Sequence, residues 1–176
     1  MLRAAFRDLH GARLHGFTLI VTLGDRSLAS RLAAQALAEG SAHVSELRHP
    51  ERASAWLRAR VLRGVKRAHG PGSTPEERRA TLAILGIDGG TFDTLAAFTP
   101  MERAALVAGV IERLDPRDLE LVLGTSATAV HRQTVAVRRH FLERRAAGSA
   151  TEGLAEPVLA NRIAEIAERA LSWHRA

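Results

Sequence analysis

Helix start and stop signals in residues 114–142 constrain the fold of this chain most, because they define two short helices joined by a sharp turn. Asp115 can accept hydrogen bonds from the free amides of a helix N-terminus, and Pro116 fits the first helical position, where no N–H is needed. Gly124 supplies the left-handed residue that commonly ends a helix, and Ser126 can cap the next one. This pattern predicts a helix-turn-helix.

The second helix of this pair has an apolar side and a basic side. Val130, Val137 and Phe141 recur at helical spacing and predict the buried side. The outward positions carry hydroxyl, imidazole and guanidinium groups, which can bind phosphates and base edges. We therefore predict that duplex DNA is bound by Thr128, His131, Arg132, Arg138 and Arg139. Capped helix pairs also occur in all-α proteins that bind no DNA, so a purely structural pair is the alternative.

The rest of the chain also shows helical periodicity, and no segment has the sustained alternation of a strand. We therefore predict an all-α fold of two small helical domains joined by a flexible linker. The first three helices are expected at about residues 2–23, 27–39 and 50–69. The apolar side expected for the first helix consists of Phe6, Leu9, Leu14, Phe17, Ile20 and Val21.

Glycine and proline at residues 69–74 interrupt the helical pattern and mark the domain boundary. We predict a core-binding-like domain at 1–69, a linker with a short helix at 70–90, a helix-turn-helix domain at 91–147 and a C-terminal extension at 148–176. The extension carries an amphipathic helix at about 156–173. This helix is expected to pack within the chain, pair with another copy or bind a partner.

Charge and composition restrict the function classes. The formal net charge is +6, and Lys66 is the only lysine, so nearly all the basic residues are arginines. Arginine binds phosphate bidentately and suits a polyanionic partner, although a GC-rich genome would produce the same bias. The absence of cysteine excludes disulfides, thiol catalysis and cysteine-based zinc sites. With neither a signal-peptide pattern nor a membrane-spanning run, we expect a cytoplasmic protein without a membrane partner.

The histidines do not form a pattern that predicts a metal site or catalysis. His10 and His15 are five residues apart, which does not place them on one helical face, and His131 and His140 are nine apart. The turn at residues 88–90 lacks the Lys-Ser/Thr pair of a phosphate-binding loop. We expect no catalytic residues, no metal, no cofactor and no enzymatic activity.

Two stretches resemble the sigma-70 family of RNA polymerase sigma factors, of the extracytoplasmic-function type. In the first domain the resemblance rests on Phe6-Arg7-Asp8-Leu9, Leu23-Gly24-Asp25-Arg26, His49-Pro50-Glu51-Arg52 and Ala55-Trp56-Leu57. In the second it rests on the ordered pieces at 95–100, 105–107 and 121–126, continued by Val130, Arg138, Arg139 and Leu142. The match covers about residues 6–142.

The resemblance implies a transcription initiation protein whose partners are RNA polymerase core, promoter DNA and an anti-sigma protein. The second helix would meet the polymerase through Leu28, Arg31, Leu32 and Gln35. The third helix would neutralise promoter phosphates with Arg58, Arg63, Lys66 and Arg67. The sequence indicates neither the promoter nor the oligomeric state.

Three positions depart from the family pattern. Arg31 stands among positions that are usually acidic, Arg63 replaces an asparagine that helps capture a flipped base, and His131 replaces an early basic residue. Reversed charge at an interface weakens it or changes the partner. The alternative is therefore a degenerate sigma-fold protein that acts by protein contacts, as an adaptor, oligomer or sequestering partner, without melting promoters. A dimeric helix-turn-helix repressor is the third hypothesis.

Overall fold

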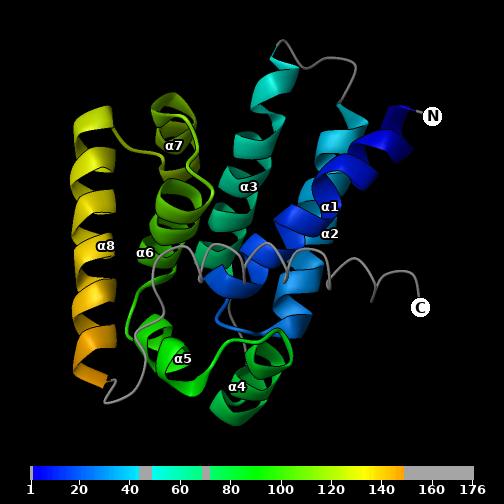
Figure 1. Ribbon diagram of the computed structural model, residues 1–176. Helices are drawn as coiled ribbons and strands as arrows, with labels where there is room; N and C mark the ends of the chain where they lie inside the picture. The colour runs from blue at the N-terminus through cyan, green and yellow to red at the C-terminus, as the bar shows by residue number, and fades with distance from the viewer. Residues whose placement is uncertain (1, 44–48, 69–71, 149–176) are drawn as a thin grey trace.

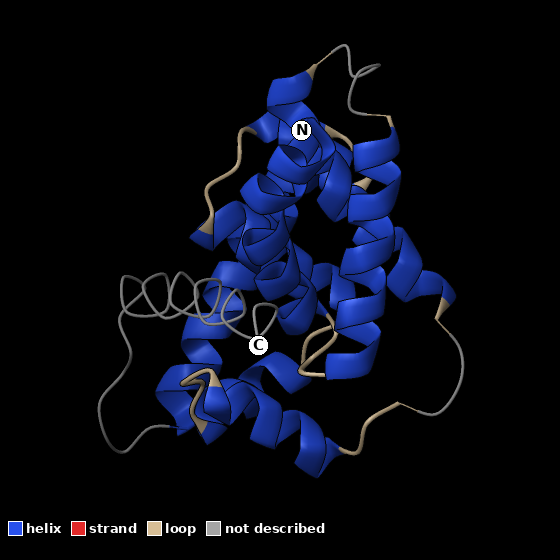
Figure 2. Cartoon of the chain, turned by 90° about the vertical axis from the view of Figure 1, so that its right-hand side faces the viewer, coloured by secondary structure: helices blue, strands red, loops and turns tan. Residues whose placement is uncertain are grey.

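The computed structural model describes residues 2–43, 49–68 and 72–148, and every regular element in these ranges is helical, which confirms the all-α fold (Figures 1 and 2). The predicted helix at 156–173 lies outside the described residues, as do 149–176 of the extension and 69–71 of the linker. The elements are α1 (Leu2–Val21), α2 (Arg26–Ala42), the 3₁₀ turn η2 (Pro50–Arg52), α3 (Ala53–Arg67), α4 (Pro75–Ile84), α5 (Gly89–Ala96), α6 (Pro100–Ala105), the π-helical η3 (Leu106–Ile111), α7 (Pro116–Leu123) and α8 (Ala127–Gly148).

The helices form layers that are best seen in Figure 1. The N-terminal helices α1, α2 and α3 pack on one another, with α3 between the α1–α2 pair and α7. Helix α8 forms the opposite edge and packs on α5, α6 and α7, while α4 and α5 lie together at one end.

Local capping contacts fix several helix starts, including the start predicted at Asp115. Thr74 and Thr99 each form a capping box with the glutamate three residues later, and a proline follows each threonine. Asp115 accepts a hydrogen bond from the backbone N–H of Arg117, and Gly124 ends α7 in the left-handed conformation at φ 65°. These contacts confirm the start and end predicted for the first helix of the helix-turn-helix.

The predicted separation into two domains differs from the structure, because the N-terminal helices α1–α3 and the C-terminal helices α4–α8 share one hydrophobic core. Phe17 and Leu57 belong to the same buried cluster as Leu106 and Leu119. Helix α1 contacts α6, and α3 contacts both α6 and α7. The apolar sides of α3 and α7 are thus buried against each other, which separate domains would leave exposed to water.

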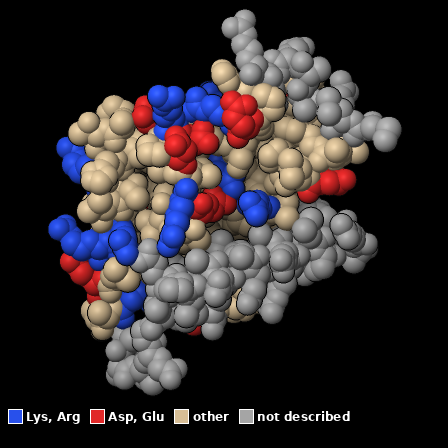
Figure 3. All heavy atoms as spheres, turned by 45° about the horizontal axis from the view of Figure 1, so that its top comes forward, with Lys and Arg blue, Asp and Glu red and all other residues tan. Residues whose placement is uncertain are grey.

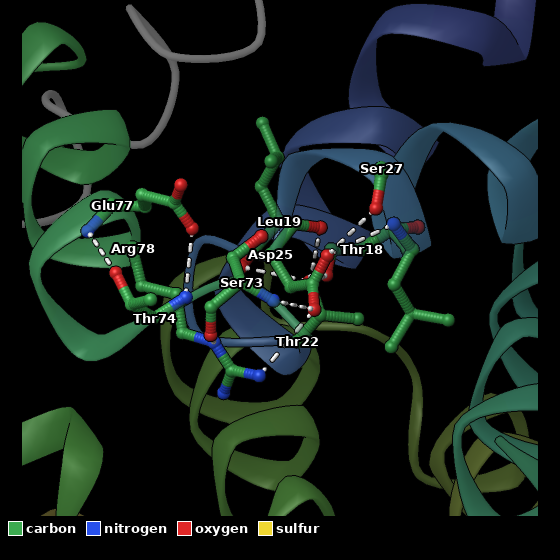
Figure 4. A network of polar contacts seen from close by, with 10 residues as sticks. Thr18, Leu19, Thr22, Asp25, Ser27, Ser73, Thr74, Glu77 and Arg78 are labelled. Carbon is green, nitrogen blue, oxygen red and sulfur yellow. Dashed lines mark hydrogen bonds and ion pairs between the residues drawn. The ribbon is translucent and has the colours of Figure 1, made fainter. Parts of the chain in front are cut away.

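The residues after the linker are held against the α1–α2 turn (Figure 4). Asp25 is buried and accepts hydrogen bonds from the backbone N–H groups of Leu28 and Ser73, 3.0 and 3.2 Å away. The Ser27 hydroxyl also donates to Asp25, at 3.2 Å, and Asp25 forms an ion pair with Arg78 at 3.4 Å. Gly24 has φ 79°, and a Cβ there would lie 2.5 Å from the Arg78 carbonyl oxygen. Only glycine therefore fits this crossing.

A π-helical turn, η3, continues α6 and changes the direction of the side chains that follow. The backbone N–H of Glu112 donates to the Val107 carbonyl, five residues back, at 2.8 Å. Gly109 in this turn lies against α8, where a Cβ would be 3.0 Å from Thr134 Cγ2. The turn brings Glu112 to α3, where it meets Arg58 at 2.5 Å.

Two details of the predicted helices were wrong. Leu9 was assigned to the core, but this residue is 71% exposed. Near the N-terminus of α1, Phe6 is buried and Leu9 faces solvent. Helix α2 extends to Ala42, three residues beyond the predicted end, because Gly40 permits close contact with Phe6 and Leu57. Among the described residues, no single helix is both long enough and apolar enough to cross a membrane. Only the helices at 89–96 and 100–111, which are sharply bent relative to each other, reach the required length and hydropathy when taken together.

Candidate nucleic-acid interface

Helices α7 and α8 form the predicted helix-turn-helix. Leu119, Val122 and Leu123 are buried on α7, and α8 places Val130 and Phe141 in the same core. Val137, the third residue predicted to face inward on α8, is also buried. Because α8 packs on α5, α6 and α7 with one side only, its other side faces outward along the helix.

The outward side of α8 carries all five residues that we predicted to bind duplex DNA. Thr128, His131 and Arg132 are exposed and make no polar contact with a described residue. Arg139 is exposed as well and forms only a long ion pair with Glu143, at 3.7 Å. Arg138 lies beside it and is exposed. The first three groups are therefore available to a ligand without disrupting the fold.

Two apolar residues on the same side of α8 were missed in the sequence interpretation. Val135 is 54% exposed and Leu142 43% exposed. They follow Thr128 at intervals of seven residues, which places all three along one line of a helix. This spacing was the signal that could have identified them. They provide methyl groups for apolar contact beside the basic side chains.

The basic end of α3 lies next to the turn of the helix-turn-helix. Arg63 and Lys66, both exposed, line a groove of about 210 Å³ together with residues 121–124 of α7. Arg67 is also exposed on α3. The structure thus brings two of the α3 cations that we predicted to bind phosphate beside the recognition unit.

Arg58, the fourth cation predicted on α3, does not face solvent, and this prediction was wrong. Its side chain is 4% exposed and forms a bidentate ion pair with Glu112, at 2.5 and 2.8 Å. It also donates to the carbonyl and the hydroxyl of Ser54 and lies over the Phe17 ring. Because its donors are used within the fold, Arg58 cannot contact a phosphate without breaking the contact between α3 and the C-terminal helices.

The predicted polymerase-binding residues of α2 separate into two groups. Arg31 and Gln35 are exposed, and Leu28 is half-buried. Leu32, however, is buried between α2 and α3, where the close approach of Gly64 leaves no room for a partner. Leu32 therefore belongs to the core of this structure and not to an open docking surface.

The positive charge of the chain is not gathered on one face. Figure 3 shows acidic side chains interspersed with basic ones. Several arginines pair with acids across elements, such as Arg52 with Asp118 at 2.8 Å and Arg79 with Asp93 at 2.5 Å. These paired arginines contribute little net positive charge to the surface around them.

The histidines do not gather into a site. Burial, and then the charge of Arg58, lower the pKa of His10 from its ordinary value, which favours the neutral imidazole. Within the described ranges, no group of three histidine, aspartate or glutamate side chains could hold a metal ion.

Comparison with known protein families and with curated proteins gives no match for this chain.

Proposed function

We propose that this protein is a sigma-like transcription protein of the cytoplasm that binds promoter DNA through the exposed side of α8. One observation carries the proposal: Thr128, His131 and Arg132 lie together on a helix-turn-helix and are not used by the fold. The helix dimensions match a major groove, which admits one α-helix. RNA polymerase core and an anti-sigma protein are the partners that the motif resemblance adds to this proposal.

The division of roles follows from chemistry. Arg132 offers a bidentate donor pair for a guanine edge, and Thr128 offers a methyl and a hydroxyl group. Arg63 and Lys66, beside the α7 turn, would contact the phosphates that flank the groove. Phosphate contacts release counterions, so affinity for duplex DNA is expected to fall steeply with salt.

The test is a binding titration of the full chain against a pool of duplex fragments from 50 to 300 mM salt. Arg132→Ala should weaken duplex binding about tenfold or more, by analogy with bidentate base contacts. Arg79→Ala removes an exposed arginine that is paired with Asp93 on another surface, and serves as the matched control. Duplex binding that is independent of salt, or equal loss in both variants, would contradict the proposal.

A second candidate function is protein binding without promoter melting. The Arg58–Glu112 pair and the shared core favour it, since they hold together two units that a polymerase-bound sigma factor would have to place on separate promoter elements. The two candidates are distinguished by an assay that detects unpaired promoter bases after core polymerase is added to the protein and duplex promoter DNA. Open-complex formation supports the first, whereas polymerase-independent capture of a protein partner, with no melting, supports the second.

A further inference from the structure

A second basic groove lies between α2 and α3, and Arg63 is the one lining residue to which the α8 proposal also gives a phosphate contact. Its volume is about 210 Å³. The α2 side contributes Arg31, Gln35 and Glu39 at intervals of four residues, so they lie on one face of the helix. The α3 side contributes Arg60, Arg63 and Arg67, and the floor is formed by Leu32, Ala36, Gly64 and Ala68.

The one acidic residue that lines this groove, Glu39, lies at one end of it and is paired with Arg60. Glu39 accepts from Arg60 at 3.1 Å and from the Gln35 amide at 3.2 Å, so its carboxylate is already used. Arg31 and Arg63 form no ion pair with a described residue; Arg63 donates only to the Ala59 carbonyl, in its own helix. Arginines from two helices thus share a small groove with one acid among them. Their mutual repulsion would be relieved by a bound anion.

The backbone holds the two helices at a fixed, close distance. A Cβ at Gly64 would lie 2.6 Å from Leu32 Cδ2, so glycine allows α3 to approach α2 at this point. The buried Leu32 anchors the floor, while the guanidinium groups rise from both sides. Guanidinium groups bind phosphate oxygens bidentately, and several around one groove favour an anion with several oxygens over a single carboxylate.

We propose that this groove binds a small oligophosphate, meaning two or more linked phosphates, either inorganic or at the end of a nucleotide. The size of the groove favours a small molecule over a strand of nucleic acid, since the Glu39–Arg60 ion pair occupies one end and places a carboxylate in the path of a continuing backbone. The groove lies apart from the α8 face and shares only Arg63 with the residues of the DNA-binding proposal, so the test is made at Arg31, which the DNA-binding proposal does not use.

The test is isothermal titration of the full chain with inorganic tripolyphosphate, adenosine triphosphate and orthophosphate at 50 mM salt. Tripolyphosphate should bind more tightly than orthophosphate, and tighter binding of adenosine triphosphate would identify a nucleotide as the ligand. Arg31→Ala should weaken tripolyphosphate binding about tenfold or more, and Arg31→Lys by less, because a charge remains without the bidentate donor pair. Arg132→Ala, on α8, should leave it unchanged.

Three results would overturn the proposal. One is the absence of tripolyphosphate binding to the wild-type chain at 50 mM salt. Another is binding that Arg31→Ala and Arg31→Lys do not affect, since it would then lie elsewhere. The third is a single-stranded oligonucleotide that competes with tripolyphosphate and binds more tightly, which would make the groove a strand-binding site. Arg31 is exposed and unpaired, so an unchanged melting temperature should show that its variants remain folded.

Discussion

Two arginines at the junction between the N-terminal and C-terminal helices, Arg58 and Arg103, differ from Arg132 on α8 in burial and in hydrogen bonding. Arg103 is 7% exposed and donates to the carbonyls of Val21, Leu95 and Phe98, at 2.9, 3.0 and 2.5 Å. Arg58 is paired with Glu112 in the same junction. Arg132 on α8, in contrast, is exposed without a described partner. The same side chain stabilises the fold in one region and is available to a ligand in the other.

This difference shows that a surplus of arginine cannot be equated with a binding surface. Burial lowers the pKa of Arg103 to about 10, which still leaves it charged at neutral pH. A buried charge needs full compensation, and here carbonyl oxygens supply it. Part of the basic composition of this chain is therefore structural, and only the remainder can act on a polyanion.

Arg103→Met should produce the largest loss of stability. The substitution keeps an apolar stem of similar length but removes the guanidinium donor from the carbonyls of Val21, Leu95 and Phe98, of which Leu95 retains the backbone N–H of Phe98 at 3.1 Å. We therefore expect about 3–5 kcal/mol of destabilisation. The free energy of unfolding in urea measures it, with Arg79→Met as the exposed control. A loss below about 1 kcal/mol would mean that the carbonyls find water and that the junction is not closed as described.

Glu112→Gln should have the next largest effect, about 2–4 kcal/mol, because the buried guanidinium of Arg58 loses its counter-charge. The double variant Arg58→Met with Glu112→Leu should recover part of that loss, since it removes both charges together. Urea unfolding of Arg58→Met, Glu112→Leu and their double variant gives the coupling energy. A coupling energy near zero would mean that Arg58 and Glu112 are solvated independently, and Arg58 would then not differ from the exposed Arg132 as described.

Asp25→Asn should have a smaller effect that depends on pH. Burial alone would raise the pKa of Asp25, but hydrogen bonds from Leu28, Ser73 and Ser27 and the charge of Arg78 together hold it below 3.8. The folded state therefore favours the carboxylate, and its contribution is present above the pKa of the unfolded chain and lost as pH falls through the folded-state pKa. We expect Asp25→Asn to cost about 1–3 kcal/mol at pH 7.

Urea unfolding from pH 7 to 2.5 should show this difference closing as the pH falls below about 4. Asp93→Asn, which alters an exposed carboxylate paired with Arg79, provides the comparison at every pH. A constant difference across the range would exclude Asp25 as the titrating group.

The smallest change in stability is expected for Arg132→Ala, within about 0.5 kcal/mol, because this side chain is exposed and makes no polar contact with a described residue. The same variant should lose affinity for duplex DNA, so stability and binding would separate at this position. Circular dichroism melting alongside the binding titration checks both. A marked loss of stability would place Arg132 with the structural arginines.

The sequence was sufficient to predict those helix starts and apolar faces that depend on residues close together in the chain. The threonine–proline–glutamate signals and the Asp115–Pro116 start lie within four residues of the contacts they make, so the helices they begin could be predicted. The apolar side of α8 follows from its own spacing.

The sequence was insufficient where a contact spans distant segments. Arg58 sits on an otherwise basic helical face, and its partner Glu112 lies 54 residues later, so no local pattern marks it as buried. The packing of α3 on α7 has the same origin, because each apolar side could equally have covered another element. For the candidate site, exposure of the α8 residues was predictable, whereas the charge balance of the α2–α3 groove depends on how two helices cross.

The π-helical turn at Leu106–Ile111 sets the rotational phase between α6 and everything that follows it. A π turn holds one residue more than an α turn, so regular α geometry over these same residues would turn the side chains that follow by about 100°. Glu112 would then point away from α3, and Arg58 would remain buried without its acid. The extra residue in this one turn thus sets the contact between the two groups of helices.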